Sequence, residues 1–383
     1  MSHLQIVDQG EIFRNPLPGH RVINCFFPAG VVLDNGEILV VARVAAAMYS
    51  VQGALELFRS TDGGRTWQRQ GPPRDVSEDR VQFNYRLGEM ALMRDGSVVL
   101  KMNRTPHADE DVLLFNAETG GVLEGQTCYL RSTDGGRTWS QPLPIHLDEP
   151  FEPRHVYEAT GRMIELTDGT WFQAFETWKH HDDANPYDLN TYGMFSSDSG
   201  RSWGGRIPIA VGRDEGRSYS HGMPIQLSDG RVFISLWTAR FDLDAFYDLH
   251  MVRSTDATCR RWVGPRPLGI PGQSSGAVEL KDGRILLIYS HRDDTDQPGI
   301  KVVMSDDAGD CFDAREPLVV WDAYGKEALG VPRTDKYPGK HDAIAYGAPR
   351  ILRLSEREAL AILWCTQSAD THCRWTRVQV TNQ

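Results

Sequence analysis

The stretch STDGGRTW occurs twice without change in this chain, at residues 60–67 and again at 132–139. Weaker copies follow: SSDSGRSW at 196–203, STDATCRRW at 254–262 and MSDDAGDCF at 304–312. In such a copy, Ser, Thr and Asp side chains can bond to nearby backbone, glycine allows a positive φ, and the aromatic residue can pack against apolar neighbours. The repeat therefore predicts a tight turn that connects two strands, with a structural rather than a catalytic role.

A second pattern precedes each copy. Two apolar segments are separated by an Asp-Gly or Asn-Gly turn, which is typical of a β-hairpin. These hairpins are expected at 29–43, 90–104, 161–175, 223–237 and 276–292. A sixth unit at 348–364 lacks the glycine and has no turn copy after it, so we expect it to share a blade with the N-terminal segment. Six units predict an all-β six-bladed β-propeller, in one domain over residues 1–383. Unrelated hairpins in a β-sandwich are the alternative.

The overall charge narrows the choice of partners. The formal net charge is −11, which argues against nucleic acid or an anionic membrane surface as a partner. No apolar run has the roughly 18 residues that a membrane span needs. The first residues lack an apolar segment after a basic start, so we expect a cytoplasmic protein. The six cysteines lack metal-binding spacing, so we expect reduced thiols and neither a metal nor another cofactor.

In a propeller, the residues that open the inner strands and end the hairpins build a central pocket. Polar side chains are frequent at these positions. Those expected at the strand openings are Arg86, Glu89, Glu158, His221, Asp342 and Tyr346. Those expected at the hairpin ends are Arg43, Arg104, Glu176, Trp178, Arg240, His291 and Arg292. Arginines suit a carboxylate, carboxylates and histidines suit proton transfer, and aromatic rings suit a sugar face, so the mixture favours a small acidic carbohydrate as the substrate.

The STDGGRTW copies and the hairpins that precede them resemble the sialidase superfamily, whose repeats are known as Asp-boxes or BNR repeats. The resemblance covers nearly the whole chain and implies a sialidase-like propeller. It also implies a site in which three arginines bind the substrate carboxylate, an Asp is the acid/base, and a Tyr activated by a Glu is the nucleophile.

This chain departs from the family pattern at several positions. Phe26 stands where the first arginine is expected, and between the first hairpin and the first STDGGRTW copy the only carboxylate is Glu56. The nucleophilic tyrosine is matched by Tyr346 in AYGA, whereas His221 occupies the place of the activating Glu. Arg240 corresponds to the second arginine. The resemblance thus implies a sialidase scaffold with altered chemistry.

Three functions fit these residues. We expect a glycoside hydrolase, in which Tyr346 or a carboxylate is the nucleophile. The candidates for its acid/base are Glu89, Glu158, Glu176 and Asp342. The first alternative is a uronate lyase in which Tyr346 and His221 carry out β-elimination. The second is a carbohydrate-binding propeller without catalysis. The polar segment 321–342 is expected to form a lid over the pocket.

Overall fold

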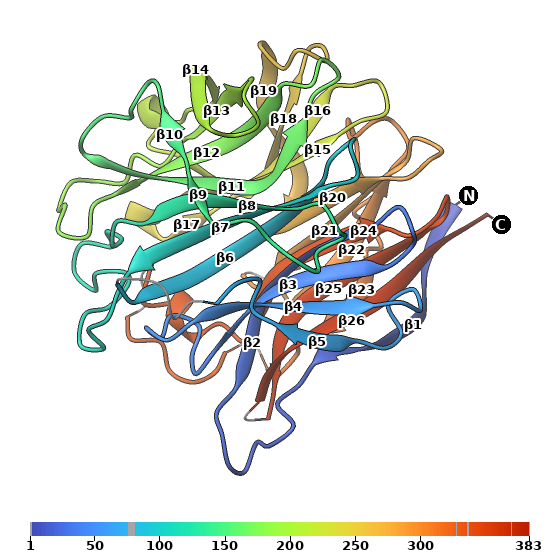
Figure 1. The fold of residues 1–383 in the computed structure, drawn as a ribbon, viewed down its shortest axis with the longest axis horizontal. Coiled ribbons are helices and arrows are strands. Elements are labelled where there is room, and N and C mark those ends of the chain that lie inside the picture. Colours follow the sequence, from blue (N-terminus) through green and yellow to red (C-terminus); the bar gives the residue numbers. More distant parts are fainter. Residues whose placement is uncertain are drawn as a thin grey trace.

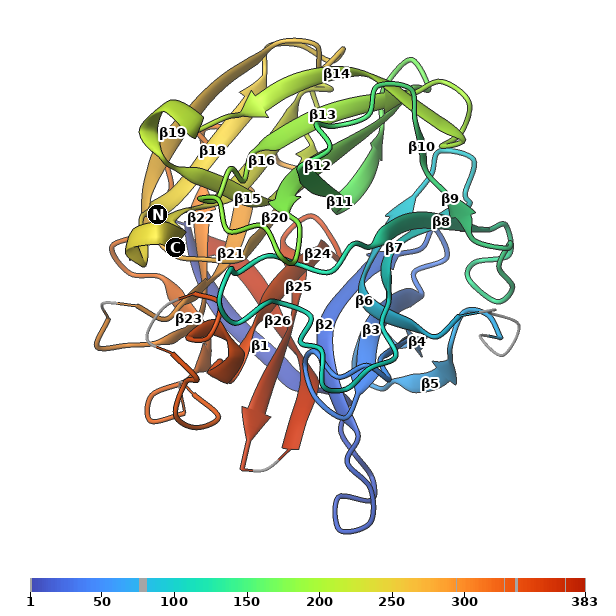
Figure 2. The same cartoon turned by 90° about the vertical axis from the view of Figure 1, so that its left-hand side faces the viewer.

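The computed structural model describes residues 2–75, 81–293, 295–326, 328–334, 337–368 and 370–382. In this part of the chain, six sheets stand around a common axis, each built on four antiparallel strands (Figures 1 and 2). Their inner strands contact one another in a closed ring. In ring order these are β2 (Asn24–Val32), β6 (Phe83–Leu92), β11 (His155–Glu165), β15 (Ser218–Gln226), β20 (Ser275–Glu279) and β24 (Tyr346–Arg353). The predicted six-bladed β-propeller is confirmed.

The remaining strands follow outward from this ring. The second strands are β3 (Ile38–Ala45), β7 (Val98–Pro106), β12 (Trp171–Lys179), β16 (Val232–Arg240), β21 (Ile285–His291) and β25 (Glu358–Gln367). The third strands are β4 (Ala54–Ser60), β8 (Gln126–Ser132), β13 (Thr191–Ser196), β18 (Asp248–Ser254), β22 (Gly299–Ser305) and β26 (Asp370–Asn382). The outer strands are β5 (Gln68–Gly71), β9 (Leu143–Pro144), β14 (Ser202–Ala210), β19 (Trp262–Pro271), β23 (Leu318–Asp322) and β1 (Ser2–Phe13). Two short strands, β10 (His146–Leu147) and β17 (Ala245–Phe246), pair with β14 and β16.

The last blade contains both ends of the described chain. Strand β1 pairs antiparallel with β26, in a register that runs from Ser2 opposite Asn382 to Phe13 opposite Cys373. The two strands and the chain ends lie side by side in Figure 1. The sixth hairpin, β24–β25, therefore shares its blade with the N-terminal segment, as the missing turn copy predicted.

Each STDGGRTW copy connects the third and the outer strand of its blade. In the second copy, Asp134 Oδ1 accepts hydrogen bonds from the backbone N–H groups of Arg137 and Thr138, both at 2.9 Å. The hydroxyl of Ser132 accepts one from the N–H of Gly136 at 2.7 Å. The hydroxyl of Thr138 also donates to Asp134 Oδ2 at 2.6 Å, and this bond, together with that from the backbone N–H of Thr138, lowers the pKa of Asp134 because it favours the ionised carboxylate. The predicted role as a connecting turn is confirmed.

The degraded copies keep the same backbone geometry. In the third copy Ser199 takes a φ of 61°, in the fourth Cys259 takes 56°, and in the fifth Ala308 takes 56°. The aromatic residue that closes the third copy, Trp203, is fully buried and stacks on Tyr129 of the preceding blade at 5.6 Å between ring centres. In this copy the turn thus ties one blade to the next although Ser199 replaces its first glycine.

Two long connections lie against each other on one face of the propeller. In the connection from β7 to β8, Phe115 and Val122 form an isolated antiparallel bridge. Val122 also pairs in parallel with His180, which follows β12. Figure 2 shows the first connection crossing the central region of this view.

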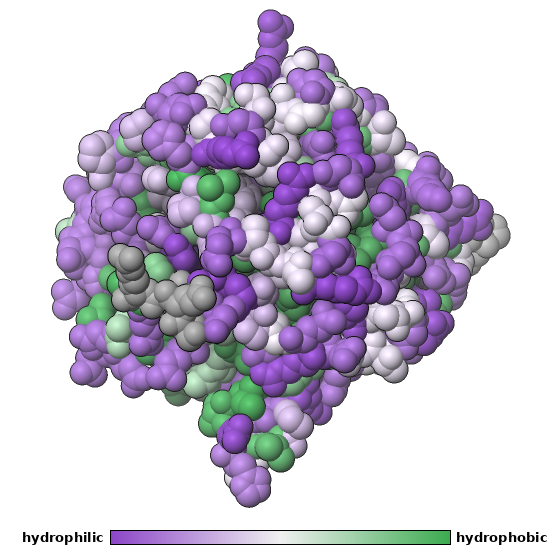
Figure 3. Space-filling model, viewed as in Figure 1, coloured by the Kyte–Doolittle hydropathy of each residue, from purple (hydrophilic) through white to green (hydrophobic). Residues whose placement is uncertain are grey.

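The described helices are short. They are the single 3-10 turns η1 (Arg213–Glu215), η2 (Phe241–Leu243) and η3 (His341–Ala343), and none of them is long and apolar enough to cross a membrane. The face seen in Figure 3 is mainly hydrophilic, with hydrophobic side chains in small separate groups.

Replacing the turn aspartate tests the role of the repeat. Asp134→Ala removes the acceptor of the two backbone N–H groups and should lower the free energy of unfolding by about 1–2 kcal/mol. Urea unfolding followed by circular dichroism measures this loss. Asp34→Ala is the control, because Asp34 is exposed and accepts no hydrogen bond from the described residues. Equal stability of the two variants would contradict a structural role for the turn.

Candidate active site

A deep cavity lies at the end of the axis where the inner strands begin. It encloses about 1070 Å³, including its open mouth, and its lining comes from all six blades. The inner strands supply Phe27, Arg86, Glu89, Glu158, His221 and Arg350, and Ser274 precedes β20. A concave site of this size with convergent polar groups has the features of a small-molecule pocket.

Bulges in four inner strands shape this cavity. The strand register shifts in β2, β11, β15 and β24, and in each shift one residue has a positive φ. These residues are Phe27 at 52°, Gly161 at 60°, His221 at 52° and Ala348 at 42°, and all four line the cavity. A left-handed non-glycine residue costs about 1–3 kcal/mol and persists where its surroundings enforce it. The bulges redirect side chains toward the axis.

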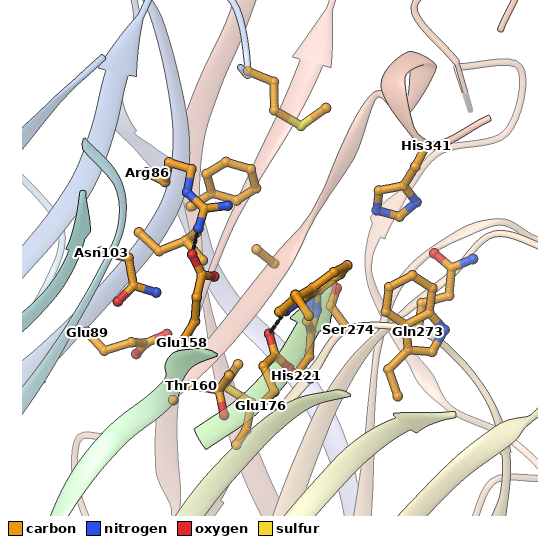
Figure 4. A pocket seen from close by; sticks show the side chains of 18 of the residues that line it. Arg86, Glu89, Asn103, Glu158, Thr160, Glu176, His221, Gln273, Ser274 and His341 are labelled. Carbon is orange, nitrogen blue, oxygen red and sulfur yellow. Dashed lines mark hydrogen bonds and ion pairs between the residues drawn. The ribbon is translucent and has the colours of Figure 1, made fainter. Parts of the chain in front are cut away.

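Two glutamates face each other on neighbouring strands. Glu158 on β11 and Glu176 on β12 are direct register partners, and both line the cavity. Glu158 forms an ion pair with Arg86 of the preceding blade. Glu176 accepts hydrogen bonds from Trp178 Nε1 at 3.0 Å and from the backbone N–H of His221 at 2.8 Å. Figure 4 shows the Arg86 and Glu158 side chains directed toward each other.

A second charged group forms the floor of the cavity. Arg350 Nε donates to Glu89 Oε1 at 2.8 Å, across the axis from blade six to blade two. Burial opposes ionisation of Glu89, but Arg350 outweighs it and holds the pKa of Glu89 below its usual value. Lys101 donates to the backbone carbonyl of Ala159 at 2.9 Å, and burial lowers its pKa to about 8. On the floor of the cavity, Glu89 and Arg350 therefore neutralise each other, and Lys101 is bonded to a carbonyl oxygen.

Aromatic rings form one wall. Trp237 is stacked between Phe246 and His341, with ring centres 5.8 Å and 5.4 Å away, and His221 meets it edge-on at 5.2 Å. Burial lowers the pKa of His221 and, strongly, that of His341, so both rings are neutral at pH 7. The indole N–H of Trp237 is buried and has no hydrogen-bond partner within the described chain, and the same holds for Trp364 on β25.

The segment expected to form a lid contributes to this wall. Tyr337 and His341 line the cavity, and Tyr337 packs on Phe241 with ring centres 4.3 Å apart. Residues 327 and 335–336 of the segment lie outside the described residues. Closure of this segment over the cavity stays a prediction.

Arg292 brings a positive charge to the lining of the cavity. Its guanidinium donates to Gln273 Oε1, to the carbonyl oxygen of Tyr346, and to Ser290 Oγ at 3.3 Å. No ion pair joins it to a described carboxylate, and its Nε is buried without a partner. Burial lowers the pKa of Arg292. An anionic group in the cavity would satisfy this cation.

Of the residues expected at the site, Arg86, Glu89, Glu158, Glu176, Trp178, His221 and Arg292 line the cavity. Tyr346 does not: it is fully buried behind Arg292, and its hydroxyl donates to the carbonyl oxygen of His291 at 2.6 Å. The structure therefore does not bring Tyr346 and His221 together on the cavity wall.

The other expected residues make contacts outside the cavity lining. Arg43 is fully buried and donates to Asn84 Oδ1 and to the carbonyl oxygen of Ser50, both at 2.6 Å. The remaining contacts are Arg104 over the Phe83 ring at 4.1 Å, Arg240 with Asp242 at 2.9 Å, His291 with Lys301 at 3.0 Å and Asp342 with Arg333 at 2.8 Å. The two residues that depart from the family pattern near the first blade are also outside the cavity lining. Phe26 packs on Trp364, and Glu56 forms an ion pair with Arg69.

Several lining residues were absent from the expected site, among them Tyr49, Lys101, Trp237, Tyr337, Arg350 and Trp364. The sequence could have indicated two of them. Trp237 and Trp364 both stand at the last position of the second apolar segment of their hairpins. Within the described residues, no group of three or more His, Cys, Asp or Glu side chains is arranged to hold a metal ion.

Comparison with known proteins adds to this geometry. The BNR repeat-like domain family model matches residues 7–234 and 97–328. A sialidase from Micromonospora viridifaciens is 26% identical over 248 residues, which are 60% of this chain and 36% of that protein. The chain thus spans little more than a third of the length of this curated relative.

Two solved structures share the propeller. A Hadza microbial sialidase superposes with a TM-score of 0.68 at 16% identity, over 97% of this chain and 68% of its own. The α-L-arabinanase of Penicillium chrysogenum, complexed with arabinobiose, superposes with a TM-score of 0.63 at 14% identity, over 98% of each chain. At these identities the likeness shows the fold alone.

The ion pair between Glu89 and Arg350 on the floor of the cavity should contribute to the free energy of unfolding. Glu89→Gln leaves Arg350 buried without its counter-charge and should cost about 3–5 kcal/mol in the free energy of unfolding. Because the pKa of Glu89 is depressed in the folded state, its contribution is present above about pH 4.3 and is lost as the pH falls further. Urea unfolding at pH 7 and at pH 4 measures both effects. The double variant Glu89→Gln/Arg350→Met should regain part of the loss, and a single-variant cost below about 1 kcal/mol would contradict the ion pair.

Proposed function

The chain belongs to the family of BNR repeat-like domains, and on this premise we propose that it is a glycoside hydrolase with Glu158 and Glu176 as its catalytic carboxylates. It is a member of the sialidase-like propeller superfamily, in which sialidases and arabinanases both occur. The fold alone does not select a substrate. The proposal therefore rests on the residues of the cavity.

The opposed glutamate pair carries the proposal. Directly opposite residues on antiparallel strands have Cβ atoms about 4.5–5.5 Å apart, and like charges in this arrangement are destabilising. A protein that only binds a sugar has no need of such a pair. In a retaining glycosidase two carboxyl groups act on the same glycosidic bond, and one attacks the sugar while the other transfers the proton. We infer a retaining mechanism for this chain.

The surroundings of the two side chains assign their roles. The guanidinium of Arg86 favours the ionised form of Glu158, which is the form that a nucleophile requires. Glu176 forms no ion pair with a described residue and contacts only neutral donors, so we assign it the role of acid/base. Glu176 protonates the leaving oxygen while Glu158 attacks the anomeric carbon. Water, deprotonated by Glu176, then releases the sugar from Glu158.

The wall of the cavity suits a sugar. The indole N–H groups of Trp237 and Trp364 and the hydroxyl of Thr160 are buried and unpartnered within the described chain, so ligand hydroxyl groups can satisfy them. Arg292 offers a cation to an anionic substituent. These groups support a small glycoside with an acidic group, such as a carboxylate, as the substrate class.

Substitution of the two glutamates tests the mechanism. Glu158→Gln and Glu176→Gln should each lower kcat/KM by about 10²–10⁴-fold on hydrolysed glycosides, because each removes one of the two carboxylates that act in the transition state. The assay uses a panel of acidic and neutral aryl glycosides and uronate oligomers, and follows both released sugar and absorbance near ~232 nm. Proton NMR of the first product should show the anomeric configuration of the substrate.

The matched control is Glu356→Gln, an exposed glutamate in the turn before β25, which should leave turnover unchanged. Azide can separate the two roles, since it should restore activity to alanine variants at both positions but give glycosyl azides of opposite configuration. Growth of the absorbance without hydrolysis would instead show β-elimination. Sugar binding without turnover would show a binding propeller.

Substitution of Arg292 tests whether the substrate carries an acidic group. Arg292→Met keeps the length of the side chain but removes the cation, so it should raise KM for acidic glycosides at least about tenfold relative to neutral ones of the same sugar ring. The comparison is made by steady-state kinetics on matched pairs of substrates. An equal effect on both members of a pair would show that Arg292 does not bind an acidic group.

A further inference from the structure

A second cavity lies at the opposite end of the propeller axis. It encloses about 1020 Å³, including its open mouth, and is lined by the final residues of all six inner strands. Between the two cavities lies a small space lined by Glu89 and Arg350 on one side and by Arg162 on the other. Only Arg162 and Ile225 line both this space and the second cavity. The second cavity is therefore separate from the proposed active site.

Three arginines line the second cavity, and none of them forms an ion pair with a described carboxylate. Arg94 donates to the carbonyl oxygen of Thr167 at 2.9 Å, and Arg353 donates to the carbonyl oxygen of Glu279 at 3.2 Å. Arg162 makes no hydrogen bond or ion pair with any described residue. The three guanidinium groups keep unused N–H donors at the cavity.

The two carboxylates in the same lining are satisfied by neutral donors instead. Glu165 accepts a hydrogen bond from the backbone N–H of Arg94 at 2.9 Å. Glu279 accepts two from Ser228, one from its backbone N–H at 2.6 Å and one from its hydroxyl at 3.0 Å. No ion pair within the described residues joins either carboxylate to the three arginines. The lining thus combines three unpaired cations with two carboxylates that are already bonded.

The depth of Arg162 distinguishes this cavity from an exposed basic patch. Arg94 and Arg353 are exposed at the rim, whereas Arg162 is partly buried on the axis. Burial lowers the pKa of Arg162, and the nearby Glu89 only partly offsets this effect. A partly buried guanidinium without a partner loses hydration that a bound anion can replace.

We propose that this cavity binds a small anion with phosphate or carboxylate groups, held by Arg162 in the interior and by Arg94 and Arg353 at the rim. Planar guanidinium groups bind both kinds of oxyanion through paired N–H donors. The site does not depend on the proposed glycosidase activity, because none of these arginines lines the first cavity.

Isothermal titration calorimetry tests the proposal on the purified chain with inorganic phosphate and, separately, with citrate, at constant ionic strength. Saturable binding with one site is expected for at least one of the two anions, and their relative affinities identify the preferred oxyanion. Arg162→Gln should weaken that binding at least about tenfold, because it removes a charge-assisted contact. Arg353→Gln at the exposed rim should weaken it as well.

The matched control is Arg284→Gln, since Arg284 pairs with Asp282 in a turn and lines neither cavity. It should leave anion binding unchanged. Thermal unfolding checks that each variant is folded. If Arg162→Gln does not fold, the binding measured for Arg353→Gln decides the outcome. The proposal is overturned if neither anion binds saturably, or if both cavity variants bind as tightly as the control.

Discussion

The antiparallel pairing of β1 with β26 is the contact on which the rest of the molecule depends. Five of the blades are formed by consecutive stretches of chain, whereas the last one needs strands from both ends. This pairing closes the ring, and closure removes the free edges that an open row of sheets would expose. Both cavities are lined by all six blades, including the last one, whose strands come from both ends of the chain.

Within the closed ring, charge is arranged by strand register. Glu158 and Glu176 meet because β11 and β12 pair directly, and Arg86 reaches the first of them from the neighbouring blade. Glu89 and Arg350 compensate each other on the floor. Arg292 in one cavity and Arg94, Arg162 and Arg353 in the other form no ion pair with a described carboxylate. The interior of the propeller therefore contains paired charges, whereas these arginines line the cavities.

The sequence predicted the fold well because its signals were local. The copies of STDGGRTW and the hairpin turns fixed the strand order, and the missing sixth copy predicted the shared blade. Residues at the cavity were harder to predict, because side-chain direction alternates along a strand and a bulge changes that alternation. Tyr346 lies just before the bulge of β24 and is buried, whereas Arg350 just after it reaches the cavity. Phe27, His221 and Ala348 gave no sign of a bulge, since none of them is glycine.

These left-handed residues also set a limit on the evolution of the protein. Glycine would fit each of the three backbone positions with less strain, because it has no Cβ. The same exchange would remove a ring or a methyl group from the cavity wall and loosen the backbone that holds Glu176 through the N–H of His221. The strain at these three positions is therefore inseparable from the shape of the cavity wall, since no other residue type would both relax the backbone and keep the side chain.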